Sequence, residues 1–219
     1  MNRARPAATL LVVRDGVDGI EVVMGRRPPG GPFGDVWVFP GGAVDPEDQA
    51  AAPDDETAWR LAALRETWEE VGLALTDPAG VPIPPGTGSV HRRMAEAGVG
   101  FAVSRLVYLS NWVTPVFVPK RFDTHFFVTD ADGDLFSGDE LAEVAWMSVE
   151  SVLTRHGRGE YPMIFPTLSH LRYVSQFSQV DDLLVEARST DIIPAIEPRR
   201  FERGSTTELI VDNDPRFRT

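Results

Sequence analysis

The chain has 219 residues, enough for one good-sized domain, and its 42% hydrophobic and 25% charged residues are ordinary for a globular protein. The net charge of −12 argues against binding of a nucleic-acid polymer, whose phosphates would be repelled, but a small phosphate ligand can still be met by a few local cations. No apolar run approaches the ~20 residues that cross a bilayer, and there is no cysteine, so we expect no membrane span and, by default, a cytoplasmic location.

The first forty residues read as a strand pair followed by a loop. β-branched runs at 8–13 and 20–26 flank the turn "RDGVDG" and predict two paired strands. The Pro- and Gly-rich segment 28–34 predicts a loop, and "DVWVFPGG" at 35–42 predicts a short strand that Pro40 and the two glycines end.

A helix is expected next, after a polar and alanine-rich connection from Gly42 to Asp55. It should run from Glu56 to Val71, with Asp54 or Asp55 as the N-cap and Gly72 at its end.

The second half of the chain alternates strands and helices. Segment 76–100 resembles an insertion loop with one short helix at about 90–97. Further strands are expected at 106–114, 122–130 and 143–149, and further helices near 148–156, 167–177 and 181–189. This interleaving predicts an α/β layered fold in a single domain over 1–197. A tail follows at 198–219, whose "TELIV" segment could add an edge strand or reach a partner chain.

Three glutamates crowd one face of the predicted helix. At about 100° per residue, Glu66, Glu69 and Glu70 fall within an arc of roughly 100°, and an apolar face with Leu64 and Trp68 lies opposite. Like charges at this spacing repel. Either the face is simply solvated, or a divalent cation cancels the repulsion.

The sequence "RETWEEVGL" resembles the second half of the Nudix hydrolase signature, G-x5-E-x7-R-E-U-x-E-E-x-G-U, in which U is bulky and apolar. The matching positions are Arg65, Glu66, Glu69, Glu70, Gly72 and Leu73. Thr67 stands where an aliphatic residue is usual. The resemblance implies the Nudix fold, a mixed β-sheet sandwiched between helices (α/β/α), here with added C-terminal helices.

The first half of the signature departs from the family pattern. Gly41 and Gly42 follow "VFP" as expected, but the segment from there to the helix is about nine residues too long. Counted back from Arg65, the expected loop glutamate falls at Thr57, and the nearest glutamate is Glu56. We therefore expect an insertion at about 43–55.

The resemblance also implies a metal-dependent diphosphate hydrolase, because carboxylate-held divalent cations neutralise phosphate oxygens and acidify water. It assigns Glu66, Glu69, Glu70 and the Gly41 carbonyl as ligands of Mg²⁺, for which Mn²⁺ can substitute. Arg65 is expected to brace the loop through a carboxylate, with Gly42 and Gly72 as structural positions.

A further catalytic glutamate often comes from a loop outside this motif in the family. "SGDELAEVAWMSVE" resembles the segment that carries it, and Glu140 is preferred over Glu143. A solvated loop glutamate is the alternative.

Beyond the motif, "VFPGGAVDPED", "FDTHFF" and "EVAWMSVESVL" resemble a sub-group that includes the peroxisomal Nudix coenzyme A diphosphatases. This favours hydrolysis of coenzyme A or acyl-CoA to 3′,5′-ADP and a phosphopantetheine product. The alternatives are hydrolysis of ADP-ribose, a dinucleotide or a nucleotide sugar, and a non-catalytic binding module.

Four cations are candidates for substrate phosphate contacts, although each could be a solvated surface charge: Arg26, Arg27, Lys120 and Arg121. The expected partner is thus a small nucleotide-type substrate. A homodimer remains open beside a monomer.

Overall fold

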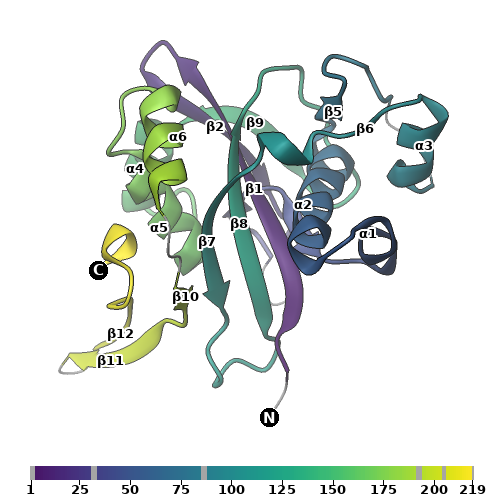
Figure 1. Ribbon diagram of the computed structural model, residues 1–219. Coiled ribbons are helices and arrows are strands. Elements are labelled where there is room, and N and C mark those ends of the chain that lie inside the picture. The colour runs from purple at the N-terminus through teal and green to yellow at the C-terminus, as the bar shows by residue number, and fades with distance from the viewer. Residues whose placement is uncertain (1–2, 31–33, 85–87, 191–193, 204–205, 219) are drawn as a thin grey trace.

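The protein is described by a computed structural model that covers residues 3–30, 34–84, 88–190, 194–203 and 206–218. A mixed β-sheet forms its middle layer (Figure 1). The strand order is β10-β7-β8-β1-β2, with β9 on the far side of β2. These strands are β1 (Arg5–Gly16), β2 (Gly19–Arg26), β7 (Val107–Val113), β8 (Phe122–Asp130), β9 (Glu143–Ser148) and β10 (Ala195–Ile196). β1 runs parallel to β8 and antiparallel to β2.

The sheet forks between β1 and β2. The two strands pair only near their turn, from Val13 with Val22 to Gly16 with Gly19, and then diverge. Two short strands fill the gap: β3 (Trp37–Val38) pairs with the end of β2, and β4 (Gly41–Ala43) pairs with β1 from Ala7 to Thr9. The two glycines of the motif therefore lie in the fork.

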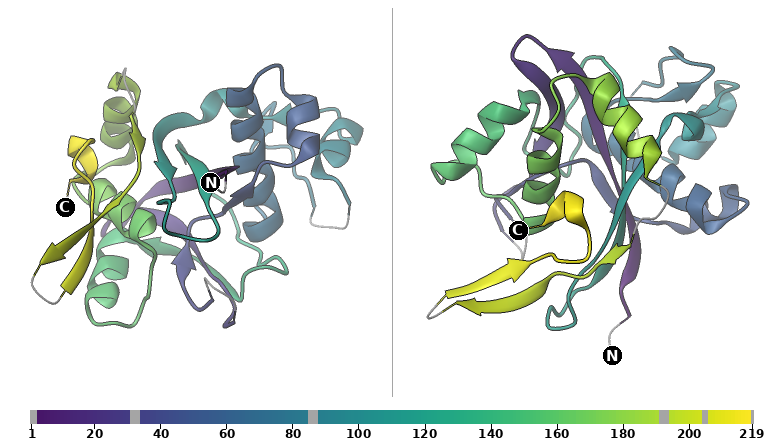
Figure 2. Two further views of the ribbon diagram at one scale, coloured as in Figure 1. Left: turned by 90° about the horizontal axis from the view of Figure 1, so that it is seen from below. Right: turned by 60° about the vertical axis from the view of Figure 1, so that its left-hand side comes forward.

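Helices cover both faces of the sheet (Figures 1 and 2). On one side lie α1 (Pro46–Ala51), α2 (Asp55–Val71) and α3 (Val90–Glu96), and on the other α4 (Val149–Gly157), α5 (Phe165–Val174) and α6 (Val180–Ser189). The expected α/β/α sandwich with added C-terminal helices is confirmed. No helix in the described ranges is both long and apolar enough to cross a membrane.

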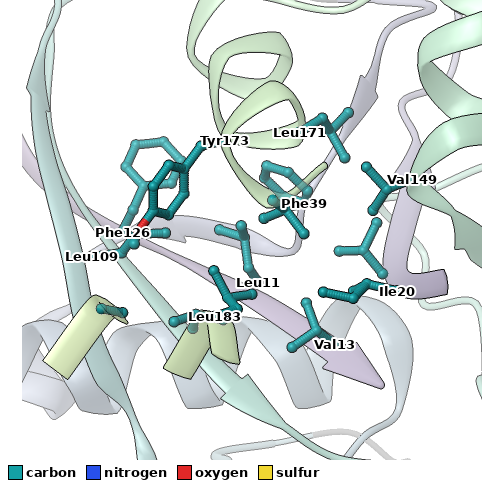
Figure 3. Packing of buried hydrophobic residues seen from close by; sticks show 14 of the residues in the cluster. Leu11, Val13, Ile20, Phe39, Leu109, Phe126, Val149, Leu171, Tyr173 and Leu183 are labelled. Atoms are coloured by element: carbon teal, nitrogen blue, oxygen red, sulfur yellow. The ribbon is translucent and has the colours of Figure 1, made fainter. Parts of the chain in front are cut away.

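Successive side chains of β1 point to opposite faces of the sheet, so the strand contributes to two separate hydrophobic clusters. Ala8, Leu10 and Val12 pack with the apolar face of α2, whereas Leu11 and Val13 pack with the C-terminal helices (Figure 3). Because β1 is covered on both faces, its sequence is a continuous apolar run rather than an alternating one.

The predicted α2 is confirmed at both ends. The Asp54 side chain accepts a hydrogen bond from Thr57 N at 2.8 Å, so Asp54 and not Asp55 is the N-cap. Gly72 ends the helix with φ +77°, a conformation that favours glycine.

The connection expected at 42–55 has more structure than the sequence analysis placed there. It holds β4 and the six-residue α1. A helix this short is marginal alone, so tertiary contacts must hold it, and its Asp48 is fully buried.

The segment after residue 197 is folded. β11 (Arg199–Arg203) and β12 (Thr206–Ile210) form a hairpin, so "TELIV" pairs with β11 instead of joining the main sheet. Phe217, in the short 3₁₀ turn Pro215–Phe217, is buried in the core against α5 and β7. Two further strands, β5 (Thr76–Asp77) and β6 (Gly100–Phe101), pair beside α3.

Candidate active site

The three clustered glutamates lie on α2, in different environments. Glu70 is buried, Glu66 is half-buried and Glu69 is exposed. The apolar side of α2 fixes this orientation, because Leu61, Leu64 and other residues of that side are buried against the sheet.

Glu70 faces the fork of the sheet. Its Oε2 accepts a hydrogen bond from Gly41 N at 2.9 Å, whereas Oε1 is buried and has no partner within the described residues. Burial raises the pKa of Glu70 to about 8, and the charges of Glu66 and Glu140 add to the shift. A buried carboxylate oxygen without a partner is costly, so this site favours a cation.

Glu66 approaches the fork from the same helix. Burial raises its pKa to about 7, although Arg65 opposes the shift. A Cβ atom on Gly42 would lie 2.2 Å from Glu66 Oε1. Only glycine at position 42 lets the carboxylate come so close.

Arg65 connects the helix to the preceding segment. It donates hydrogen bonds to Asp48, at 3.0 Å from Nη2 to Oδ2, and to the Ala43 carbonyl at 2.9 Å. Its Nη1 lies 2.9 Å from Glu66 Oε1 and 2.8 Å from Glu69 Oε2. Burial alone would lower the pKa of Arg65, but the Asp48 hydrogen bond and the surrounding carboxylates raise it.

Asp48 is the residue that the sequence analysis missed. When the G-x5-E part of the signature is counted forward from Gly42 rather than back from Arg65, its carboxylate falls at position 48. This chain has aspartate there in place of glutamate. The extra residues thus lie between Asp48 and Arg65. Glu56 instead pairs with Arg60, at 2.7 Å from Oε1 to Nη2, with an exposed side chain. A forward count would have found Asp48.

A second insertion element also contacts Asp48. His91 Nε2, on α3, lies 2.9 Å from Asp48 Oδ1. Burial alone would raise the pKa of Asp48, but the hydrogen bonds from His91 and Arg65 keep it below its ordinary value. Asp48 is therefore an ionised, fully buried carboxylate between both insertions and α2.

The loop between β8 and β9 brings Glu140 to the same site. Phe136 N donates to the Val71 carbonyl at 2.9 Å, and Gly138 N to the Glu70 carbonyl at 3.0 Å. These carbonyls lack partners within the helix, so the loop completes the end of α2. The exposed Glu140 contributes to the raised pKa values of Glu66 and Glu70. Glu143 lies instead in β9, opposite Arg26.

A cavity of about 450 Å³ begins at the fork. Gly41 and Gly42 form part of its wall, which is otherwise mainly aromatic and aliphatic. Among the four candidate cations, Arg27 and Lys120 line this cavity. The positive charge of Arg27 also lowers the pKa of Glu70, against the larger effect of burial.

The other two candidate cations have protein partners. Arg26 Nε donates to Asp35 Oδ1 at 2.9 Å. Arg121 Nε donates to the Thr114 carbonyl at 2.8 Å, and its Nη2 lies 3.5 Å from Glu197 Oε1. In each pair of adjacent cations, Arg26–Arg27 and Lys120–Arg121, one residue lines the cavity and the other does not.

The donor set fits a hard divalent cation, although the side chains do not converge as they stand. Across the described ranges, no group of three or more His, Cys, Asp or Glu side chains is placed to hold an ion. Glu66 and Glu69 point to Arg65 Nη1, while Glu70 Oε1 has no partner among the described residues. Carboxylate oxygens are the ligands that Mg²⁺ prefers. The chemistry of Glu66, Glu69 and Glu70 therefore fits the ion, and their carboxylates would have to turn toward a common point to hold it.

Comparison with known proteins gives the context of this geometry. Residues 3–165 match the family model of the NUDIX domain. The chain is similar to the acyl-coenzyme A diphosphatase NUDT19 of Gallus gallus, with 26% identity over 191 residues and 71% of this chain covered. It spans about half (49%) of that curated relative's length.

Solved structures share the fold. A NUDIX hydrolase from Alicyclobacillus acidocaldarius is 30% identical, with a TM-score of 0.75 over 89% of this chain and 100% of the other. The NUDIX domain of Shewanella oneidensis NrtR, solved with ADP ribose, is 13% identical, with a TM-score of 0.52 over 80% of this chain and 88% of the other. The second likeness concerns the fold alone.

The Asp48–Arg65 contact gives a testable expectation. Asp48→Ala removes a buried partner of a buried guanidinium, so we expect unfolding free energy to fall by on the order of 3 kcal/mol. Glu56→Ala, which removes an exposed i,i+4 pair, should change it by less than about 0.5 kcal/mol. Urea unfolding at pH 7 measures both. A greater loss of unfolding free energy for Glu56→Ala than for Asp48→Ala would contradict the conclusion that Asp48 is the carboxylate that holds Arg65.

Proposed function

The chain belongs to the Nudix hydrolase family, and on this premise we propose that it hydrolyses a diphosphate linkage in a nucleoside diphosphate derivative, with Mg²⁺ or Mn²⁺ as cofactor. The observation that carries this proposal is Glu70, whose buried Oε1 has no hydrogen-bond partner among the described residues, while its Oε2 accepts a hydrogen bond from Gly41 N in the wall of a cavity that Arg27 also lines. Three carboxyl groups thus gather next to a space that a substrate can enter, and Arg65 pairs with Glu66 and Glu69 but not with Glu70 Oε1.

Within the proposal, Glu66, Glu69 and Glu70 hold the cation, with the Gly41 carbonyl as a further ligand. When bound, the cation would neutralise phosphate oxygens and acidify a water molecule. Arg65 stays with Asp48 and Ala43 O and so keeps α2 in place when Glu66 and Glu69 turn away from its Nη1. Glu140 is proposed to orient or deprotonate the attacking water, because its loop is fixed to the end of α2.

Coenzyme A or an acyl-CoA is the substrate class we propose. The similarity to an acyl-coenzyme A diphosphatase supports it, as does a cavity whose largely apolar wall suits a substrate with an apolar arm beside its diphosphate. Arg27, at the Glu70 end, is proposed to bind the diphosphate, and Lys120, exposed in the cavity wall, is a second cation available to a phosphate.

The metal assignment predicts the behaviour of Glu70→Gln. The change keeps the shape of the side chain and an acceptor for Gly41 N but removes the ligand charge. We expect turnover to fall by about 10²-fold or more and Mn²⁺ binding, measured by electron paramagnetic resonance without substrate, to weaken. Glu56→Gln, at the exposed start of the same helix, is the control. Normal activity in a folded Glu70→Gln protein would rule out the assignment.

The role proposed for Glu140 predicts that Glu140→Gln and Glu143→Gln differ in their effect on turnover. Glu140→Gln should lower kcat by about 10²-fold with little change in KM, as expected for a group that acts on proton transfer. Glu143→Gln, in β9, should leave both parameters unchanged. The reverse result would place the catalytic group at Glu143.

The substrate assignment is tested with coenzyme A, dephospho-coenzyme A, an acyl-CoA, ADP-ribose and a dinucleotide in Mg²⁺. We expect coenzyme A or the acyl-CoA to be cleaved fastest. Arg27→Ala should lower kcat/KM by about one to two decades, the value of a charged hydrogen bond to phosphate. Arg26→Ala is the matched control, because Arg26 is paired with Asp35. Faster cleavage of ADP-ribose would overturn the coenzyme A assignment but not the diphosphatase activity.

A further inference from the structure

The C-terminal hairpin forms part of the cavity that begins at Gly41. Pro198, immediately before β11, and Leu209, in β12, both line it. These residues lie outside the segment 3–165 that matches the NUDIX domain. Part of the cavity wall is therefore built by a segment of the chain that the matched domain does not include.

The strand register identifies which face of the hairpin points inward. Leu209 is paired with Arg200 in the antiparallel ladder, so their side chains lie on one face. Phe201 and Glu208 are the next pair and lie on the opposite face. Leu209 lines the cavity, so the face with Leu209 is the inner one.

The inner face of the hairpin contacts the loop between β7 and β8, residues 114–121. The Arg200 guanidinium lies 3.9 Å from the centre of the Phe117 ring. Glu197 Oε1 accepts a hydrogen bond from Val116 N at 3.2 Å. The hairpin and the loop thus form one rim, and both lie at the end of the sheet where β1 begins (Figure 1).

This rim carries apolar side chains both in the cavity wall and on the protein surface. Val118 and Leu209 line the cavity, while Val116 is 65% exposed and Phe117 is 41% exposed. Contiguous exposed apolar side chains beside an apolar cavity indicate a place where an apolar ligand lies.

We propose that this rim binds the acyl arm of an acyl-CoA substrate and so selects for chain length. The diphosphate lies at the Gly41 and Arg27 end, the arm runs through the cavity between Val118 and Leu209, and the chain leaves over Val116 and Phe117. The inference rests on the proposed acyl-CoA diphosphatase function. Each methylene that is buried at the rim should raise affinity roughly fourfold.

The test compares coenzyme A with acetyl-, hexanoyl- and dodecanoyl-CoA. Binding is measured by calorimetry in EDTA, where no turnover occurs, and kcat/KM is measured in Mg²⁺. We expect wild-type affinity to rise with chain length. Leu209→Ser should remove about tenfold of the affinity for dodecanoyl-CoA and much less of the affinity for coenzyme A, which has no acyl chain. Thermal melting of each variant reports that it is folded.

Two further variants keep the result decisive. Phe201→Ser, on the outer face of the same hairpin, should behave as wild type. Val118→Ser approaches the arm from the loop side and should reproduce the effect of Leu209→Ser. If affinity is independent of chain length, or if Phe201→Ser and Leu209→Ser act alike, the rim does not bind the acyl arm. Coenzyme A cleavage without chain-length dependence would refute only this inference, whereas absence of cleavage for every diphosphate would refute the proposed function.

Discussion

The candidate site depends on one buried cation. Arg65 is 6% exposed, and a guanidinium in such a place is stable only when acceptors replace its lost water. Asp48 and Ala43 O supply acceptors from the preceding segment, while Glu66 and Glu69 supply them from its own helix. Because the buried guanidinium needs all these hydrogen-bond acceptors, it holds α1, β4 and α2 together. Glu66 and Glu69 can lie this close together because the guanidinium offsets part of their mutual repulsion.

The same charge explains how the long insertion is accommodated. Extra residues between Asp48 and Arg65 would separate the two if the chain between them stayed extended. Instead α1 and the start of α2 fold back, so that Asp48 still reaches the guanidinium. His91, from the other insertion, takes the remaining side of Asp48. The two insertions are thus connected through one carboxylate and are part of the site's support.

Local signals in the sequence were enough to predict α2, whose cap at Asp54, apolar face and Gly72 terminus all agree. The paired β-branched runs likewise predicted β1 and β2. Local signals could not place α1, which is held by the tertiary contacts of Asp48. They also could not tell which of Arg26 and Arg27 lines the cavity, because adjacent residues at the end of a strand point in different directions. Arg26 pairs with Asp35, whereas Arg27 lines the cavity. Asp48 was missed because the extra residues were assumed to precede the first carboxylate of the signature.

The fork in the sheet joins the polar and the apolar parts of the site. Gly41 fixes Glu70 through its N–H and also forms a wall of the cavity, so a few backbone atoms of β4 serve both. β4 is itself held by β1, which is buried on both faces. Another part of the cavity wall, in contrast, is formed by a hairpin outside the main sheet. Substitutions in that hairpin can therefore change the shape of the cavity without moving Gly41 or Glu70. The carboxylate cluster and the hairpin side of the cavity are therefore supported by different parts of the fold, the first by β1, β4 and α2 and the second by a separate two-stranded sheet.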